Sequence, residues 1–499
     1  MKFSTKLEGV TKFKAEGLVI GVTENKINNG NVAALDKILS GHIKKTARTE
    51  KFKGKAGQVL SLNTLGMTKV ERIVLVGLGI EKDITLDTAR RSGAKGASAM
   101  RASGIKAFGI TMAAHPLNSL SSGLLAQALA EAIILASYSF DTFKTKKSDG
   151  KIDLVTFLLE KESDGVAVRR GVEKGKKLAE AVCFARDLIN LPSNYATPSY
   201  LASQAQKLAK GKLKCKVLGP RSIRKLGMGG LMGVSQGSNE PAKFIILEFM
   251  NSKTDKKPIV LVGKGVTFDT GGISIKPSAN MEEMKMDMSG AAAVLGAMKA
   301  ASELNLRANI VALVPTTENM PGGNSYKPGD VLTGLSGVTM EILNTDAEGR
   351  LILSDAIAYA DRYKPDCIVD LATLTGACAV ALGNHASGLF STDKQILEQI
   401  RQAGEETGER CWPMPLWEDY EEEINSSVAD VQNIGQRWGG AITAATFLKK
   451  HINKNKWAHI DIAGTAYTNK PRHYLSKGGL GIGVRLLIEF VEKRTKLKK

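Results

Sequence analysis

The chain is 499 residues long, so it can form more than one domain, each with a sizeable core. Hydrophobic residues make up 43% of it and aromatic residues 5%, a composition typical of a soluble α/β protein. No apolar run approaches the roughly 20 residues that a membrane helix needs, and the first residues show no secretory signal. The five cysteines form no C-x-x-C pair, which favours reduced thiols. We therefore expect a cytoplasmic protein without a membrane anchor or a disulfide framework.

The net charge of +19 is concentrated towards the N-terminus. Residues 1–160 carry 24 Lys and Arg against 14 Asp and Glu, a net charge of +10. A solvated basic surface is the simplest interpretation, and a face that binds a polyanion such as DNA is the alternative. No helix-turn-helix, zinc-finger or RNP pattern supports a dedicated nucleic-acid reader. An additional polyanion-binding role of the N-terminal region therefore stays open.

Strand-like and helix-like patterns alternate along the first third of the chain. Apolar runs predict strands at Leu18–Val22, Arg72–Gly77, Phe108–Met112 and Leu154–Leu159, and helical periodicity marks residues 31–40, 85–103 and 120–137. This alternation predicts an N-terminal α/β domain over residues 1–165, for which we expect a mixed sheet.

A long amphipathic pattern follows, from about Asp164 to Asn190. It ends before Pro192, whose ring and missing N–H disfavour further helix. We expect residues 166–190 to form a helix that links the two domains.

The remaining residues, 191–499, repeat the α/β pattern with stronger strands. Strands are predicted at Phe244–Phe249, Ile259–Val262, Ile310–Val314, Val338–Leu343 and Cys367–Leu371, and helices at Gly290–Glu303, Leu351–Arg362 and Ile396–Gly404. We expect a C-terminal α/β/α domain around a central mixed sheet.

The octapeptide Asn-Thr-Asp-Ala-Glu-Gly-Arg-Leu at 344–351 is the most informative segment. Asp346, Glu348 and Arg350 are spaced two apart, so an extended backbone would point all three to one side. Unpaired charges are costly to desolvate. Either a divalent cation or an Arg–carboxylate ion pair would neutralise this face, and Gly349 marks a place where the backbone turns or a ligand comes close.

Upstream segments supply further candidate ligands. Lys264 ends an apolar strand, Asp269 follows in a Gly-flanked turn, and Asp287 lies just before a helix. Lys276 adds a cation, and none of the six histidines lies in these segments. Such an oxygen-rich set suits Mn²⁺ or Mg²⁺ and, with one nitrogen donor, Zn²⁺. Four carboxylates exceed what a single catalytic zinc usually takes, and they could hold two ions about 3.5–4 Å apart.

Five segments in order carry a resemblance to a known family. They are Val-Gly-Lys-Gly-Val-Thr-Phe-Asp, Gly-Gly-Ile-Ser-Ile-Lys-Pro, Glu-Asn-Met-Pro-Gly-Gly, the octapeptide, and Trp-Ala-His-Ile-Asp-Ile-Ala-Gly-Thr-Ala. Over roughly residues 165–490 the chain resembles the leucyl aminopeptidases of peptidase family M17, for which the octapeptide is a signature. The N-terminal third matches more weakly.

The resemblance implies a centre of two divalent metal ions, with Mn²⁺ or Zn²⁺ expected and Mg²⁺ or Co²⁺ as further candidates. By resemblance, Asp269 and Glu348 bridge the ions, Asp346 completes the more loosely held site, and Lys264 and Asp287 complete the tighter one. A lysine ligates only as the neutral amine, which requires a depressed pKa that two dications would supply.

The resemblance also implies roles for the two remaining cations. Lys276 is expected to polarise the scissile carbonyl and stabilise a gem-diolate. Arg350 is expected to hold a bicarbonate ion that acts as general base on a metal-bound water. One metal would anchor the free α-amine of the substrate, so the enzyme would remove N-terminal residues from peptides.

Substrate preference and assembly are expected from the same family. The pocket for the first side chain, Leu or another apolar residue, maps onto Met284, Thr373, Gly376, Ala463 and Ala466. Small peptides are the implied substrates. The implied assembly is a homohexamer, a dimer of trimers, with active sites facing an internal cavity.

Two motifs point to other chemistries and carry less weight. Residues 233–237 satisfy the G-x-S-x-G pattern of serine hydrolases, but the preceding Met-Gly-Gly-Leu-Met-Gly is a poor elbow strand. Residues 77–79 begin a dinucleotide fingerprint whose third glycine is replaced by Lys82. We interpret the latter as an ordinary βα turn.

Overall fold

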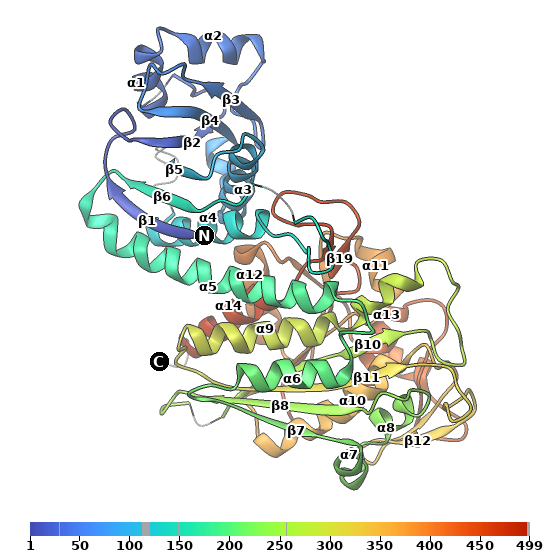
Figure 1. Cartoon of the computed structure of the whole chain (residues 1–499). Helices are drawn as coiled ribbons and strands as arrows, with labels where there is room; N and C mark the ends of the chain where they lie inside the picture. Colours follow the sequence, from blue (N-terminus) through green and yellow to red (C-terminus); the bar gives the residue numbers. More distant parts are fainter. Residues whose placement is uncertain (29, 112–119, 148–149, 256, 497–499) are drawn as a thin grey trace. The chain divides into compact units, whose positions relative to one another are not determined.

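A computed structural model describes residues 1–28, 30–111, 120–147, 150–255 and 257–496 (Figure 1). The chain forms two compact units, one of Met1–Glu180 with Lys470–Ser476 and one of Ala181–Asn469 with Lys477–Lys499. The division falls within α5 (Gly165–Asn190), the helix that the sequence predicts as a link. No sequence pattern indicated that residues 470–476 would join the first unit.

The first unit is built on a six-stranded mixed sheet. Its strand order is β1-β6-β5-β2-β4-β3, parallel except for β3, which runs antiparallel to β4. The strands are β1 (Lys2–Leu7), β2 (Ala15–Thr23), β3 (Val59–Asn63), β4 (Val70–Gly79), β5 (Ala107–Thr111) and β6 (Leu154–Leu159). The four predicted strands lie in this sheet, except that Met112 falls outside the described residues. Sequence analysis missed β1 and β3, which alternate exposed and covered residues instead of forming an apolar run.

Helices cover both faces of this sheet. Val19 and Val74 belong to a core with α3 (Leu86–Ala102) and α4 (Ser122–Ala136). Their strand neighbours Leu18 and Ile73 belong to a second core with α1 (Gly30–Ile38) and α2 (His42–Thr49). Because successive strand residues point to opposite faces, the sheet separates two apolar layers.

The second unit contains a larger mixed sheet of order β16-β15-β18-β14-β9-β11-β8-β7, with β10 paired to β11 beside this path. The strands are β7 (Leu213–Leu218), β8 (Lys243–Met250), β9 (Ile259–Gly263), β10 (Gly265–Asp269), β11 (Asn309–Asn319), β14 (Cys367–Ala372), β15 (Ser387–Ser391), β16 (Cys411–Pro413) and β18 (Trp457–Asp461). The central strands β18, β14, β9 and β11 are mutually parallel. Their carboxyl ends therefore meet at one edge, where α/β sheets bind ligands.

Two groups of helices surround this sheet. One shares a buried apolar cluster with the strands and consists of α7 (Pro220–Leu226), α8 (Gly229–Ser235), α10 (Glu348–Ala360) and α13 (Gly440–Lys449). The other, α9 (Ser289–Glu303), α12 (Lys394–Thr407) and α14 (Val484–Lys496), packs α14 against both α9 and α12 (Figure 1). The remaining helices are α6 (Pro198–Leu208) and α11 (Gly376–Leu382).

Short strands form two further sheets, β12 (Val331–Thr333) with β13 (Thr339–Glu341) and β17 (Val431–Gln432), and β19 (Tyr467–Thr468) with β20 (Gly478–Gly479). The strand predicted over 338–343 is thus only three residues long and lies outside the main sheet. The predicted two-domain α/β class with mixed sheets is confirmed. Within the described ranges, none of the helices has the length and apolar character to cross a bilayer.

Candidate metal centre

The predicted ligands gather at the carboxyl edge of the parallel strands. Lys264 joins β9 to β10, and its N–H donates to the carbonyl of Leu371 in β14 at 3.0 Å. Asp269 is the last residue of β10 and not part of the predicted turn. The turn follows at Gly271, whose φ of 86° a residue with a Cβ rarely adopts.

The octapeptide is not extended, so the predicted row of charges on one strand face is wrong. Helix α10 begins at Glu348, which places Glu348 and Arg350 in its first turn. The Asn344 side chain accepts a hydrogen bond from the Asp346 N–H at 2.8 Å. A turn closed by such a side-chain-to-backbone hydrogen bond is incompatible with an extended strand and is common just before a helix.

Asp287 comes from a separate helical segment. Residues Met281–Met288 form a 3₁₀ helix. Asp287 is buried near the end of this helix, directly before α9, as predicted. This helix, the start of α10 and the segment after β14 all contact the side chain of Lys264.

Lys264 is the centre of the buried half of the site. Its Nζ lies 2.8 Å from Asp287 Oδ2 and 2.8 Å from Glu348 Oε1, and it donates to the Thr373 carbonyl at 2.9 Å. The residue is 3% exposed. A Cβ on Gly349 would lie 2.7 Å from Lys264 Nζ, so the group that approaches Gly349 closely is this lysine side chain.

Lys276 lies in the more exposed half of the site. Its Nζ lies 2.8 Å from Asp269 Oδ2 and also pairs with Asp346 Oδ1. The side chains of Lys276 and Asp346 are 21% and 32% exposed, whereas that of Asp269 is 3% exposed. Solvent therefore reaches the site from the side of Lys276 and Asp346.

Burial and the repulsion between carboxylates disfavour the charged forms of Asp287, Asp346 and Glu348. Oxygens of Asp269, Asp346 and Glu348 lie within 4.8 Å of one another. Burial, followed by the charge of Asp269, raises the pKa of both Asp346 and Glu348. Burial likewise raises the pKa of Asp287 well above its usual value. Divalent cations would relieve this repulsion, so the donor set fits the predicted metals.

The charges around Lys264 have two consequences. Burial lowers the pKa of Lys264, but the negative charges of Asp287, Glu348 and Asp269 more than offset this and raise it overall. The ammonium form is therefore favoured while these carboxylates are its partners. Its predicted role as a ligand needs the neutral amine, which dications beside the same carboxylates would favour.

Arg350 is buried next to the cluster but pairs with neither Asp346 nor Glu348, so the alternative of an ion pair within the octapeptide is wrong. Its Nη1 donates to the Asn433 carbonyl at 2.7 Å, and its Nε meets no acceptor in the described part of the chain. Burial lowers the pKa of Arg350 to about 10, which keeps it protonated at neutral pH.

The predicted pocket residues lie on several elements. Thr373, just after β14, donates its hydroxyl to Asp287 Oδ1 at 2.7 Å. Met284 is half-buried in the 3₁₀ helix, Gly376 begins α11 and is exposed, and Ala463 is half-buried after β18. Ala466 is only 1% exposed. Their role in binding a substrate side chain stays a prediction.

Sequence analysis missed the side chains that hold the predicted ligands in place. Asn319, at the end of β11, donates to Asp269 Oδ1 at 2.8 Å and to the Thr345 carbonyl at 3.0 Å. Tyr326 donates its hydroxyl to the same carbonyl at 2.7 Å. The position of Asn319 at the carboxyl end of a parallel strand was a usable signal, whereas nothing near Tyr326 in the sequence marks it.

The G-x-S-x-G motif does not form a nucleophile elbow. Ser235 is the last residue of α8, and its hydroxyl donates to the Met232 carbonyl at 2.9 Å. A nucleophile elbow needs the serine on a turn from a strand into a helix. The motif therefore carries no serine hydrolase site.

Comparisons with known proteins agree with this geometry. The family model "Cytosol aminopeptidase family, catalytic domain" matches residues 183–488, and the N-terminal domain model of that family matches residues 19–147. The chain is 44% identical to a probable cytosol aminopeptidase of Methylobacillus flagellatus and 44% identical to one of Geobacter sulfurreducens, with 99% of each chain covered in both cases.

Two solved structures are also similar. A mutant of tomato leucine aminopeptidase has a TM-score of 0.91 at 33% identity, covering 99% of this chain and 96% of its own. The bottromycin maturation enzyme BotP in complex with Mn has a TM-score of 0.85 at 33% identity, covering 96% of this chain and 100% of its own.

Proposed function

Because this chain belongs to the cytosol aminopeptidase family and is a peptide hydrolase, we propose that it removes N-terminal residues from small peptides with the help of two divalent metal ions. The observation that carries the proposal is the cluster of Asp269, Asp346 and Glu348, whose oxygens lie within 4.8 Å of one another. Lys264 and Asp287 complete the proposed ligand set. The Mn complex of the similar BotP supports a metal of this kind.

The ions would act as Lewis acids, lower the pKa of a water molecule and anchor the substrate amine. Lys276 is the cation on the more exposed side of the site, and in this proposal it would donate hydrogen bonds to negative charge that develops on the scissile carbonyl. Among the described residues the buried Nε–H of Arg350 has no acceptor, so it could hold a small anion such as bicarbonate, which would take up the proton. No histidine is needed for this step.

Met284, Thr373, Gly376, Ala463 and Ala466 form the proposed pocket for the first side chain. Small or apolar residues at these positions suit Leu or another apolar side chain at the substrate's N-terminus. We further propose a homohexamer in the cytoplasm, as expected from the family.

The decisive experiment is metal reconstitution. The chelated protein should be inactive on Leu-p-nitroanilide, and Mn²⁺, Zn²⁺, Co²⁺ or Mg²⁺ added back should restore hydrolysis, since the ligands are oxygens and one amine. Absence of hydrolysis with every metal would overturn the proposed function.

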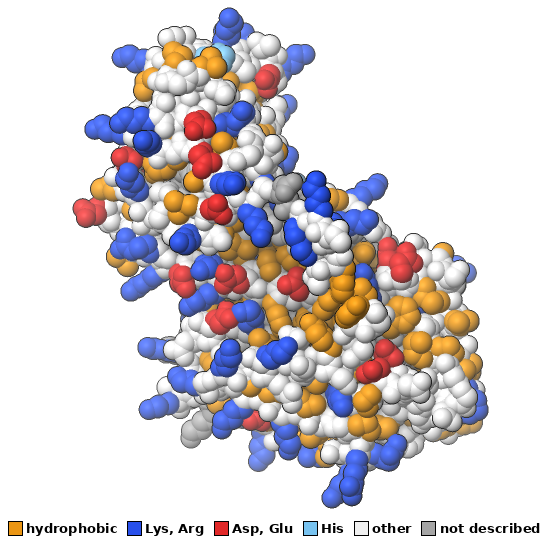
Figure 2. All heavy atoms as spheres, viewed as in Figure 1, with side chains coloured by type: hydrophobic (Ala, Val, Ile, Leu, Met, Phe, Trp, Pro, Cys, Tyr) orange, Lys and Arg blue, Asp and Glu red, His pale blue; other side chains and the backbone are white. Residues whose placement is uncertain are grey.

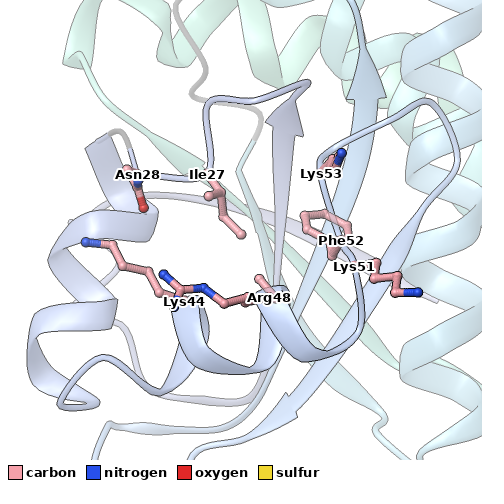
Figure 3. A pocket seen from close by; sticks show the side chains of 8 residues that line it. Ile27, Asn28, Lys44, Arg48, Lys51, Phe52 and Lys53 are labelled. Carbon is pink, nitrogen blue, oxygen red and sulfur yellow. The ribbon is translucent and has the colours of Figure 1, made fainter.

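A second function, polyanion binding, is favoured by one pocket of the N-terminal unit. Figure 2 shows Lys and Arg side chains over the surface of both units, and four of them line a pocket of about 320 Å³ in the first unit. Figure 3 shows Lys44 and Arg48, both from α2, on one side of this pocket, and Lys51 and Lys53 on the other. Phosphate groups are the ligands that such a cationic surface attracts.

Salt dependence tests this second function. If two to four of these cations contact phosphates, the affinity for duplex DNA in gel shifts should fall about tenfold to a hundredfold between about 50 and 200 mM salt. An affinity that stays constant over this range would exclude a phosphate-driven mode. Hydrolysis measured in parallel should be unaffected by bound DNA.

A further inference from the structure

Asn433 is a buried residue with no assigned role, and its side chain and its backbone carbonyl contact opposite ends of the octapeptide segment. It directly follows β17 and is 0% exposed. Its own N–H donates to the Glu341 carbonyl at 2.8 Å, which continues the pairing of β17 with β13 and fixes its place.

The carboxamide of Asn433 makes hydrogen bonds with three backbone groups at the start of the octapeptide, on Leu343 and Asn344. Its Oδ1 accepts from the Leu343 N–H at 2.8 Å and the Asn344 N–H at 3.3 Å, and its Nδ2 donates to the Asn344 carbonyl at 2.6 Å. A side-chain amide offers an acceptor and a donor in one rigid plane. Asp would lose the donor, and Ala would leave all three groups without this partner.

The backbone carbonyl of Asn433 makes a fourth contact, with Arg350 Nη1 at 2.7 Å. One residue thus fixes the backbone two positions before Asp346 and, independently, the guanidinium of Arg350. Asn344 in turn accepts from the Asp346 N–H, so the restraint reaches the proposed ligand directly.

We propose that Asn433 is a positioning residue that sets the distance between the carboxylate of Asp346 and the guanidinium of Arg350. The inference rests on the proposed function of these two residues. The carboxylate of Asp346 is the most exposed of the proposed ligands, so its geometry depends more on its backbone than on packing. Loss of such outer partners typically costs about 10–100-fold in metal affinity or activity.

The test compares Asn433→Ala and Asn433→Asp with a matched control, Asn309→Ala. Asn309 also clasps a loop with its amide, since it accepts from the Ser252 N–H at 2.9 Å and donates to the Ser252 carbonyl at 3.1 Å. Asn309 is the first residue of β11, and the candidate metal centre lies at the other end of this strand. Substitution of Asn309 should therefore affect stability and not catalysis. The readouts are Mn²⁺ affinity by titration calorimetry, kcat and KM at saturating Mn²⁺, and Tm.

Both Asn433 variants should lose about 10–100-fold in Mn²⁺ affinity or in kcat, with KM much less changed, while Asn309→Ala stays near wild type in both. Variants of Asn433 that lower Tm and leave affinity and kcat near wild type would overturn the proposal. Should Asn433→Ala fail to fold, Asn433→Asp decides, because it keeps the volume and the acceptor. An inactive wild type would refute the proposed function, whereas Mn²⁺ affinity would still test Asn433.

Discussion

The candidate metal centre of the second unit and the basic pocket of the first unit use charge in opposite ways. Lys264 is buried, and its ammonium group contacts the carboxylates of Asp287 and Glu348, which belong to two different helical segments. In the pocket, Lys44 is exposed, and its nearest carboxylate oxygen, on Asp36, is 3.7 Å away. Buried charges are costly unless their partners are placed accurately, whereas exposed charges are screened and mobile. The first arrangement can specify chemistry, and the second supplies mainly an attractive field.

Removal of one charge from each region should show this contrast most clearly. Asp346→Ala removes a proposed ligand and should lower kcat at least about 10²-fold. Because the pKa of Asp346 is raised by burial and by the charge of Asp269, its loss relieves repulsion and should not lower the free energy of unfolding. Metal content by mass spectrometry, kcat and thermal unfolding would measure these effects.

Lys44→Ser is the matched control because it also removes one charge. It should leave kcat, metal content and unfolding near wild type, since substitutions of exposed residues usually change stability by less than about 0.5 kcal/mol. Full turnover in Asp346→Ala would contradict the ligand assignment. An equal loss in both variants would instead show that the total charge, and not the geometry, governs activity.

The same contrast explains which features the sequence could predict. Apolar strands such as Ile259–Gly263 are covered on both faces, so their hydrophobic runs identify them. The carboxyl ends of parallel strands meet at one edge, and this made the grouping of Lys264 and Asp269 predictable. The exposed edge strand Lys2–Leu7 has no comparable run, and it was missed.

Long-range hydrogen bonds account for the rest. Asn433 reaches Leu343 across 90 residues, and Asn319 reaches Asp269 across 50. Such partners follow from strand register and loop paths, which no local pattern encodes. The start of α10 at Glu348 was missed for a related reason, since a spacing of two between charged residues resembles strand alternation.

Gly349→Ala tests how tightly the side chain of Lys264 is packed in the candidate metal centre. The new Cβ would lie 2.7 Å from both Cε and Nζ of Lys264, whose ammonium is held by Asp287 and Glu348. Overpacking of this kind costs about 1–3 kcal/mol, and the helix preference of Ala over Gly offsets up to about 1 kcal/mol of it. We expect a net loss of about 1–2 kcal/mol in denaturant unfolding, together with weaker metal binding because Lys264 must move.

Gly323→Ala is the control for this substitution, because its Cβ would meet open space. It should change stability by less than about 0.5 kcal/mol and leave metal affinity unaltered. If Gly349→Ala behaved in the same way, Lys264 would have room to move aside without losing Asp287 and Glu348. The buried lysine would then be as adaptable as the exposed Lys44, and the contrast between the two regions would no longer rest on fixed geometry.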